Sequence, residues 1–433
     1  MKNIYAVHAC FFRIDRLLWK EIGGGNMDKT RISELKNFYH RTLIDDVMKF
    51  WVNSDLIDEK YGGFITSVDR EGRSYNNDKS VWFQGRCLWT FSKLCNLYGE
   101  NPTWRKAADL GAEFIKKYCI DNTDGRMYFT VTQDGKPLRK RRYFFSESFL
   151  VVGFAEYYQI SKNPSDLYLA ERYFDLMYSI YKNPANDPFK ITPKENAAVR
   201  NLHSNANPMV LVSSAQTLRR IDSSRKEYYE GIIKNLIDDM IGLHYKPDLK
   251  CVLENVKMDG SILDNPTGRT VNPGHTIENS WFLMNYAAET NDSDLLKKAL
   301  NMLQWSLELG WDKEFGGMYY FIDIYNRPCE QLEHDMKLWW VHNECLIATL
   351  TALKLTGEKV YEEWYEKLHS YIFSHFPDKE FGEWYGYLHR DGTVSHTQKG
   401  SLWKGPYHLP RCLMLCEQIL SSMEQGARLP RLL

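Results

Sequence analysis

The repetition of one helix-and-hairpin unit is the feature that most constrains how this chain can fold. From about residue 31 onward, apolar residues recur with the roughly 3.6-residue period of an α-helix. This period predicts twelve helices, most of them in consecutive pairs joined by short turns. They are expected at 31–53, 80–99, 102–119, 144–162, 164–183, 208–221, 224–243, 273–291, 293–310, 335–356, 358–375 and 406–424.

Short β-hairpins are predicted between these helix pairs. Each begins with alternating residues and turns at Asp-Gly or an equivalent, which favours a tight reversal. Their starts lie about 60 residues apart, or a multiple of that spacing. The repetition predicts an all-α fold, an (α/α)6 barrel with short hairpins at one end; a two-domain helical protein is the alternative. The five hairpin segments are 61–72, 124–135, 251–260, 315–326 and 381–392.

The domain boundaries follow from what the repeat covers. The chain has 433 residues, more than a typical single domain, but no Pro/Ser-rich or low-complexity connector follows residue 30. Residues 28–433 are therefore predicted to form one barrel domain. Residues 1–27 are predicted to be an N-terminal extension that is not native, because they lack a signal-peptide cleavage site and a Gly-rich run precedes Met27, where translation is expected to start.

Charge and cysteine content exclude several classes of protein. A formal net charge of −1, without a long run of like charge, argues against a nucleic-acid partner. No apolar run is long enough for a membrane span. The nine cysteines are scattered and contain no C-x-x-C, which is typical of reduced thiols in a cytoplasmic protein.

The stretch Asn272 to Phe282 carries the clearest candidate for chemistry. Asn272 is a good helix N-cap, and Pro273 suits the first helical position, where no backbone N–H is needed. His275 and Glu278 then lie three residues apart, on one face of the first turn. The positive end of the helix dipole is expected to favour the neutral, proton-accepting form of His275.

Three further residues are candidates for the same site. Arg86 lies within a helix among aromatic residues, where it needs an anionic or carbonyl oxygen as partner. Glu344 lies in an apolar helix, where an unpaired carboxylate would be costly. His408 begins a helix behind a Gly-Pro turn. For each of these three side chains, and for His275, the alternative is a purely structural role as a buried or solvated group.

Together the four residues favour proton transfer at a carbon beside a carbonyl. No H-E-x-x-H, G-x-S-x-G, Walker A or dinucleotide motif is present, so we predict no metal and no required cofactor. One imidazole can take the proton while the other returns it from the opposite face, and Arg86 can stabilise the enediolate oxygen.

At these residues the chain resembles the N-acylglucosamine 2-epimerase family, whose mammalian members are also called renin-binding protein. The resemblance covers residues from about 40 to 420 and rests on several motifs in order. The motifs are Tyr61-Gly62-Gly63-Phe64, Val81-Trp82-Phe83-Gln84-Gly85-Arg86, Asn272-Pro273-Gly274-His275-Thr276-Ile277-Glu278, Met336-Lys337-Leu338-Trp339-Trp340-Val341-His342-Asn343-Glu344, Gly382-Glu383-Trp384-Tyr385-Gly386-Tyr387 and Lys404-Gly405-Pro406-Tyr407-His408-Leu409-Pro410-Arg411-Cys412.

The resemblance implies an (α/α)6 barrel, usually a homodimer, that interconverts N-acetyl-D-glucosamine and N-acetyl-D-mannosamine. It also implies that ATP acts as an allosteric activator rather than a reactant. The family's catalytic Arg, two His and Glu fall on Arg86, His275, His408 and Glu344.

The resemblance also bears on the substrate. Related epimerases and isomerases of mannose or cellobiose carry a Met-His pair on the helix near residue 208, whereas Met209 is followed here by Val210, which favours an N-acylamino sugar. Glu278, Glu147 and Asn207 are the candidate substrate-binding residues; for the last two, a capping or core role is the alternative.

Two other classes of function stay open. A glycoside hydrolase on the same barrel would need two carboxylates, and Glu344 and Glu278 are the pair the sequence offers. A protein-binding module is the non-catalytic alternative, but a pure binder has no need of two imidazoles in a cleft.

Overall fold

The computed structural model describes residues 27–141, 143–189 and 201–433. The predicted N-terminal extension falls almost wholly on residues 1–26, outside the described residues, and stays a prediction.

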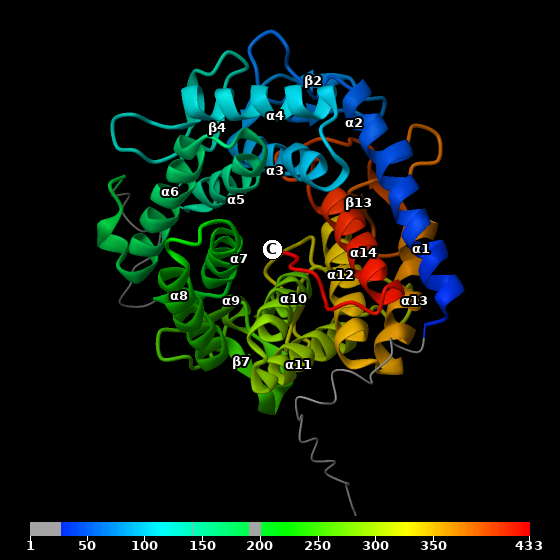
Figure 1. The fold of residues 1–433 in the computed structure, drawn as a ribbon. Coiled ribbons are helices and arrows are strands. Elements are labelled where there is room, and N and C mark those ends of the chain that lie inside the picture. The colour runs from blue at the N-terminus through cyan, green and yellow to red at the C-terminus, as the bar shows by residue number, and fades with distance from the viewer. Residues whose placement is uncertain (1–26, 142, 190–200) are drawn as a thin grey trace, which may run out of the picture.

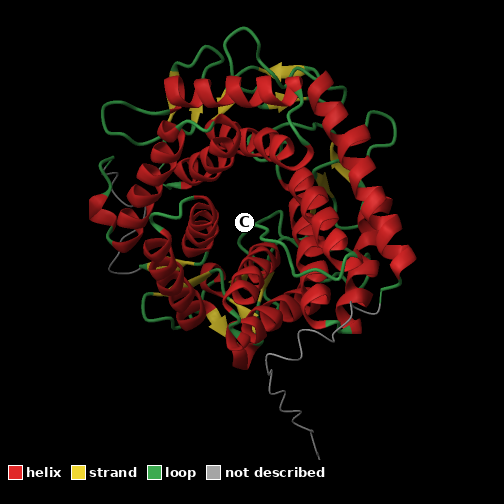
Figure 2. Ribbon diagram, viewed as in Figure 1, coloured by secondary structure: helices red, strands yellow, loops and turns green. Residues whose placement is uncertain are grey.

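The helices form two concentric rings (Figures 1 and 2). The chain alternates between the rings, beginning in the outer one and ending in the inner one, so the first helix packs against the last. The inner ring contains α3 (Val81–Tyr98), α5 (Phe145–Ser161), α7 (Ala206–Ile221), α10 (Pro273–Thr290), α12 (Trp339–Thr356) and α14 (His408–Glu424). The outer ring contains α1 (Lys29–Arg41) with η2 (Thr42–Met48) and α2 (Lys49–Asn53), α4 (Pro102–Phe114) with η3 (Ile115–Cys119), α6 (Pro164–Lys182), α8 (Lys226–Asp239) with η5 (Met240–His244), α11 (Ser293–Gly310) and α13 (Lys359–His375).

This arrangement confirms the (α/α)6 barrel and all twelve predicted helices. The largest shift in a helix start is in α12, predicted from residue 335, because residues 337–338 pair as a strand with residues 387–388. One short helix, α9 (Pro266–Arg269), was not predicted.

Burial differs between the rings for a simple reason. An inner helix contacts the outer ring, two inner neighbours and the barrel interior, so it needs apolar residues on every side. Every residue of α12 from Trp339 to Leu353 is buried. The outer helix α4 instead buries mainly one stripe of small residues and Phe114. The ring closes where α3 meets the segment before α14, and there Thr90 Oγ1 donates a hydrogen bond to the Pro406 carbonyl (2.6 Å).

One turn recurs after four outer-ring helices and explains the Gly-rich repeats in the sequence. After α2, the Asp58 carbonyl accepts from the Gly62 N–H (2.8 Å), and the Asp58 N–H donates to the Gly63 carbonyl (3.1 Å). The φ angles of Gly62 and Gly63 are positive, which favours glycine there. The same pair of backbone bonds forms at Asp121, Asp312 and Asp378. Each aspartate also binds a lysine: the pairs are Asp58–Lys79, Asp121–Lys140, Asp312–Lys337 and Asp378–Lys399.

Three of the five predicted hairpins form as expected. They are β1 (Ser67–Val68) with β2 (Ser74–Asn76), β4 (Thr130–Val131) with β5 (Pro137–Arg139), and β13 (Tyr387–Leu388) with β14 (Val394–His396).

The other two predicted hairpins are wrong in their pairing. The strand β8 (Cys251–Val252) pairs with the preceding β7 (Tyr245–Lys246), and β9 (Asn255–Lys257) pairs with β6 (Leu202–Ser204). The strand β11 (Ile322–Asp323) pairs with β10 (Thr270–Val271). A turn motif specifies only a local reversal, whereas the barrel brings these distant strand edges together.

The strands lie where the inner helices begin. The strands β3 (Lys79–Ser80), β6, β10 and β12 (Lys337–Leu338) lead directly into α3, α7, α10 and α12. The N-terminal ends of the inner helices therefore lie at the same end of the barrel as the strands and turns. This confirms the prediction that the hairpins lie at one end.

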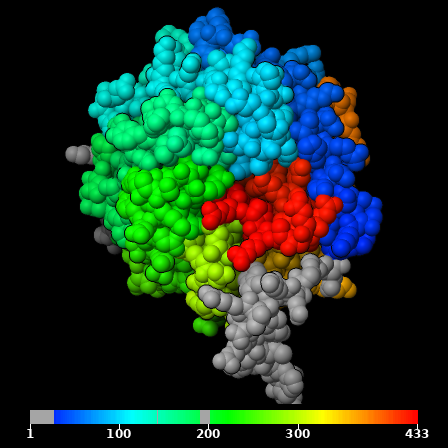
Figure 3. Space-filling model, in the orientation of Figure 1, coloured from blue at the N-terminus to red at the C-terminus, as the bar shows by residue number. Residues whose placement is uncertain are grey.

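The C-terminal segment 425–433 reaches toward the barrel axis from the end of α14 (Figures 1 and 3). Leu432 is 1% exposed, and the Asn285 side chain donates to the Pro430 carbonyl (3.0 Å). In the part of the chain that the structure describes, no helix combines the length and apolar character that crossing a bilayer requires. The eight described cysteines are all free thiols.

Candidate active site

A cavity of about 620 Å³ lies within the inner ring, at the ends of the helices that adjoin the strands. Its wall is largely aromatic, with a small group of charged side chains. It is lined by Trp82, Arg86, Phe145, Ser148, Phe149, Val152, Ala206, Met209, Val210, Ser213, Ser214, His275, Glu278, Phe282, Tyr320, Glu333, Met336, Leu338, Trp339, Trp340, Tyr387, His396, Trp403, Tyr407, His408 and Arg411. Three of the four predicted catalytic residues, Arg86, His275 and His408, line it.

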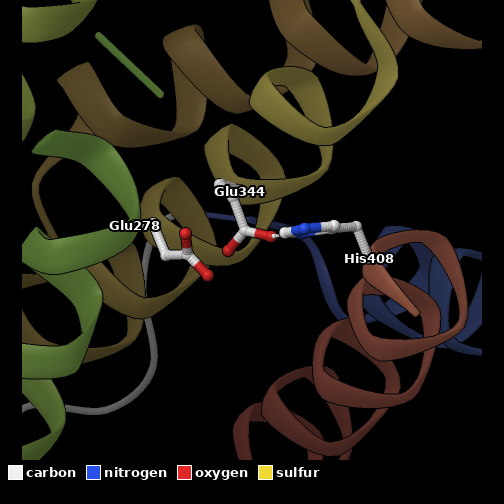
Figure 4. Close-up of side chains that lie close together, drawn as sticks. All are labelled: Glu278, Glu344 and His408. Atoms are coloured by element: carbon white, nitrogen blue, oxygen red, sulfur yellow. Dashed lines mark hydrogen bonds and ion pairs between the residues drawn. The ribbon is translucent and has the colours of Figure 1, made fainter. Parts of the chain in front are cut away.

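The fourth, Glu344, lies directly behind the cavity wall. Its carboxylate is fully buried and accepts three hydrogen bonds, from His408 Nδ1 (2.9 Å), Arg411 Nη2 (2.6 Å) and Trp281 Nε1 (2.9 Å). Figure 4 shows it between Glu278 and His408. The expectation that this carboxylate must be paired is confirmed, and the pairing offsets the cost of its burial.

His408 is oriented to accept a proton at Nε2. Because Nδ1 points at the Glu344 carboxylate, that nitrogen carries the proton and Nε2 keeps its lone pair. Burial, and then the nearby guanidinium of Arg411, hold the pKa of His408 well below its ordinary value. His408 is therefore neutral at physiological pH.

His275 has the opposite electrostatic environment. Asn272 caps α10, and its side-chain oxygen accepts from the His275 backbone N–H (3.1 Å), as predicted. His275 Nδ1 lies 3.1 Å from both oxygens of Glu254. Burial lowers the pKa of this imidazole, but Glu254 and Glu278 outweigh burial and raise it above its ordinary value. The expectation that the helix dipole keeps His275 neutral is thus wrong, because a full carboxylate charge at contact exceeds the partial charge of a helix end.

Arg86 is the cation available to a ligand. Its guanidinium donates to the Trp403 carbonyl (3.1 Å) and lies 4.1 Å from the centre of the Phe149 ring. Burial lowers the pKa of Arg86 to about 10, so it stays charged at neutral pH. Among the described residues no carboxylate forms an ion pair with it. The prediction that Arg86 has an anionic or carbonyl oxygen as partner is confirmed, and the partner is the Trp403 carbonyl.

Arg411 holds the two carboxylates together. Its Nη2 donates to Glu344 and to Glu278 Oε1, and it lies 3.3 Å from His408 Nδ1. Glu278, Glu344 and His408 could in principle hold a metal ion, since their ligand atoms lie within 4.8 Å of one another. The guanidinium already lies among these atoms and supplies the positive charge they share. The absence of a required metal stays a prediction.

Glu147 does not line the cavity, which corrects its expected role in substrate binding. Its carboxylate is fully buried and accepts from Arg126 Nε (2.7 Å) and the Met127 N–H (3.0 Å). Gln84 and His342 accept backbone N–H groups at the corresponding turns of the repeat, those of Phe64 (2.8 Å) and Met318 (2.9 Å). Glu147 therefore makes, in the second repeat, the structural contact that Gln84 and His342 make in their own repeats.

The helix α7 contributes an apolar wall. Met209 and Val210 line the cavity, whereas Asn207 is half-buried in the first turn and is not among the lining residues. Contact of Asn207 with a substrate stays a prediction.

Sequence reasoning missed two residues that hold the imidazoles. Arg411 lies three positions after His408 on α14, and that spacing could have indicated a shared face. Glu254 reaches His275 from the segment between β8 and β9, and no local pattern predicts this contact. Trp340 belongs to one of the sequence motifs and was not predicted as a site residue, yet the centre of its ring lies 5.4 Å from that of His275 and 5.7 Å from that of His408.

Comparison with known proteins shows the family and the fold of this chain. Residues 63–412 match the profile of the N-acylglucosamine 2-epimerase family. The chain is 34% identical to N-acylglucosamine 2-epimerase of Rattus norvegicus over 389 residues, 88% of this chain and 91% of that protein. It is 33% identical to the Homo sapiens enzyme of that name over 387 residues, 88% and 89% of the two chains. The fold matches cellobiose 2-epimerase from Bacillus thermoamylovorans with a TM-score of 0.78 at 20% identity, over 89% and 99% of the chains.

Proposed function

The chain belongs to the N-acylglucosamine 2-epimerase family, and we propose that it interconverts N-acetyl-D-glucosamine and N-acetyl-D-mannosamine by proton transfer at C2 between His408 and His275. It is a sugar 2-epimerase, an isomerase that needs no net oxidation. The observation that carries the mechanism is that two imidazoles line one cavity with different partners: His408 Nδ1 contacts Glu344 beside the Arg411 guanidinium, whereas His275 Nδ1 contacts Glu254.

The reaction begins with the open-chain sugar, because only a carbonyl at C1 makes the C2 proton acidic. In one direction, neutral His408 takes that proton at Nε2 while Glu344 stabilises the imidazolium that forms. Arg86, which has no carboxylate partner among the described residues, stabilises the negative charge that develops on the C1 oxygen. Protonated His275 then delivers a proton to the other face of C2. The reverse direction runs through the same steps with the two roles exchanged.

Glu344 acts through His408 rather than on the sugar. It is fully buried, does not line the cavity, and has its oxygens bound to His408, Arg411 and Trp281. This arrangement argues against the glycoside hydrolase alternative, which would need Glu344 and Glu278 both to face the scissile bond. Glu278 lines the cavity and is the better candidate for a contact to a sugar hydroxyl or amide.

Proton NMR in D₂O tests both the substrate and the mechanism. N-acetyl-D-mannosamine incubated with the protein is expected to give N-acetyl-D-glucosamine that carries deuterium at C2. If neither a new epimer nor deuterium appears, mannose and cellobiose are the next substrates to try. Turnover of either, without turnover of the N-acyl sugar, would overturn the assignment of substrate.

We further propose that ATP activates the enzyme without being consumed, and that the protein is a cytoplasmic homodimer. These proposals rest on the resemblance to the family and on the scattered free cysteines. Repeating the NMR assay with and without ATP tests the first. Sedimentation equilibrium tests the second: a monomer at assay concentration would contradict it.

A further inference from the structure

The segment that follows β5 lies beside the mouth of the catalytic cavity. The Arg141 guanidinium is 4.0 Å from the centre of the Phe129 ring and 5.3 Å from that of Trp403. Trp403 lines the cavity, and its carbonyl binds Arg86. Arg141 and Arg86 therefore both contact Trp403, Arg141 at its ring and Arg86 at its backbone carbonyl.

Two basic side chains of this segment have no carboxylate partner among the described residues. Residues 137–141 contain three basic and no acidic side chains. Lys140 pairs with Asp121 and Asp124, each at 2.6 Å, so its charge is neutralised. Within the described ranges, neither Arg139 nor Arg141 forms an ion pair with a carboxylate.

The Arg141 side chain has a hydrogen-bond donor without an acceptor among the described residues. It is half-buried, and its Nε is buried without a hydrogen-bond acceptor. Burial, and then the neighbouring charge of Arg139, lower the pKa of Arg141, whereas a bound carboxylate would raise it. Arg139 lies on the same ring, 5.8 Å from the centre of Phe129, so both guanidinium groups lie close to one aromatic side chain.

We propose that Arg139 and Arg141 form a binding site for the phosphate group of a phosphorylated ligand at the mouth of the cavity. Two arginines suit a dianion, and a planar guanidinium stacked on an aromatic ring keeps its N–H edge free for phosphate oxygens. The phosphate has two possible sources. It belongs either to a phosphorylated N-acylhexosamine whose sugar enters the cavity, or to a separate molecule that binds at the rim.

The test measures binding without turnover, so it does not depend on the proposed reaction. Isothermal titration calorimetry with inorganic triphosphate, and separately with N-acetyl-D-mannosamine 6-phosphate, is applied to the wild type, R141Q and R139Q/R141Q. The matched control is K136Q, which removes an exposed basic residue of the same hairpin that already pairs with Asp134 (3.0 Å). Thermal unfolding of each variant checks that the fold is intact, and R141K provides a charge-conserving alternative if R141Q is unstable.

The wild type is expected to bind at least one of the two compounds, and R141Q to weaken that binding by about tenfold or more, as expected for loss of a charge-assisted contact. K136Q should bind like the wild type, and kcat/KM for unphosphorylated N-acetyl-D-mannosamine should stay within about twofold of the wild type in every variant. Binding of the sugar phosphate with C2 epimerisation identifies a second substrate; binding of triphosphate alone identifies a separate ligand. No binding of either compound to the wild type, or equal binding by R141Q, overturns the proposal.

Discussion

The two imidazoles of the cavity face the same space but have different surroundings. His408 donates through Nδ1 to Glu344, and the guanidinium of Arg411 lies beside the same nitrogen, so burial and positive charge keep this histidine neutral. His275 donates to Glu254 with no arginine between them, so negative charge prevails and raises its pKa. A carboxylate at Nδ1 orients either ring, but a neighbouring cation decides which ring holds a proton.

This difference suits an enzyme that removes one proton from a carbon and adds another proton to the same carbon. An acid and a base are both needed at once, and the one-proton state of the pair supplies them in either direction. The activity should therefore fall at low pH, where His408 also becomes protonated. It should fall again at high pH, where His275 loses its proton.

Removing each imidazole gives the largest expected effect and the sharpest comparison. Both H408A and H275A should lose epimerisation by about 10⁴-fold, the upper range for a general acid or base. H275A keeps the neutral base His408, so it should still exchange the C2 proton of one epimer for deuterium without forming the other. H408A keeps an imidazole that favours its protonated form, so its exchange should be slower.

Proton NMR in D₂O measures both the exchange and the inversion for each variant, and circular dichroism confirms the fold. Equal exchange by H275A and H408A would show that the two histidines do not differ as proposed. Turnover like that of the wild type in either variant would show that proton transfer uses other groups.

Replacing Glu344 should have the next largest effect, because it removes the charge that stabilises both Arg411 and the imidazolium of His408. E344Q should lower kcat by about 100-fold with a smaller change in KM, as for a group that acts mainly in the transition state. The exposed Glu363 on α13 offers a matched control as E363Q. A change in KM alone would place Glu344 in substrate binding instead.

Replacing Glu254 should shift the pH dependence more than the maximal rate. In E254Q the carboxylate that raises the pKa of His275 is gone, so the pKa falls. The loss of activity at high pH should then begin at a lower pH, while the low-pH limb set by His408 stays in place. At neutral pH the rate should fall by about tenfold. Profiles of kcat/KM against pH measure this, and an unchanged high-pH limb would contradict the assignment of the acid.

The smallest effect is expected at Trp340, whose ring lies close to both imidazoles. W340F keeps an aromatic ring and should reduce kcat/KM by about threefold, in keeping with the modest energy of aromatic contacts. A loss comparable to that of E344Q would show that Trp340 contributes more than packing against the two imidazoles. A measurement of kcat/KM at a single pH is sufficient to test this prediction.

Much of this molecule could be predicted from local sequence. The cap of α10 at Asn272 and Pro273 forms as expected because capping depends on residues that are adjacent in the chain. The barrel was predictable because the repeat recurs throughout the chain. Pairings over long distances were not: β9 binds β6, and Glu147 binds Arg126 although its sequence context resembles that of a site residue.

By itself the sequence determined the helices, the barrel they form and four of the residues that line its cavity, Arg86, His275, Glu278 and His408, since periodicity and local motifs encode these directly. Only the tertiary structure decided how the histidines are charged. Burial and Arg411 lower the pKa of His408, whereas Glu254, from another segment of the chain, raises the pKa of His275. Electrostatic energy depends on distance in space, and the fold alone sets that distance.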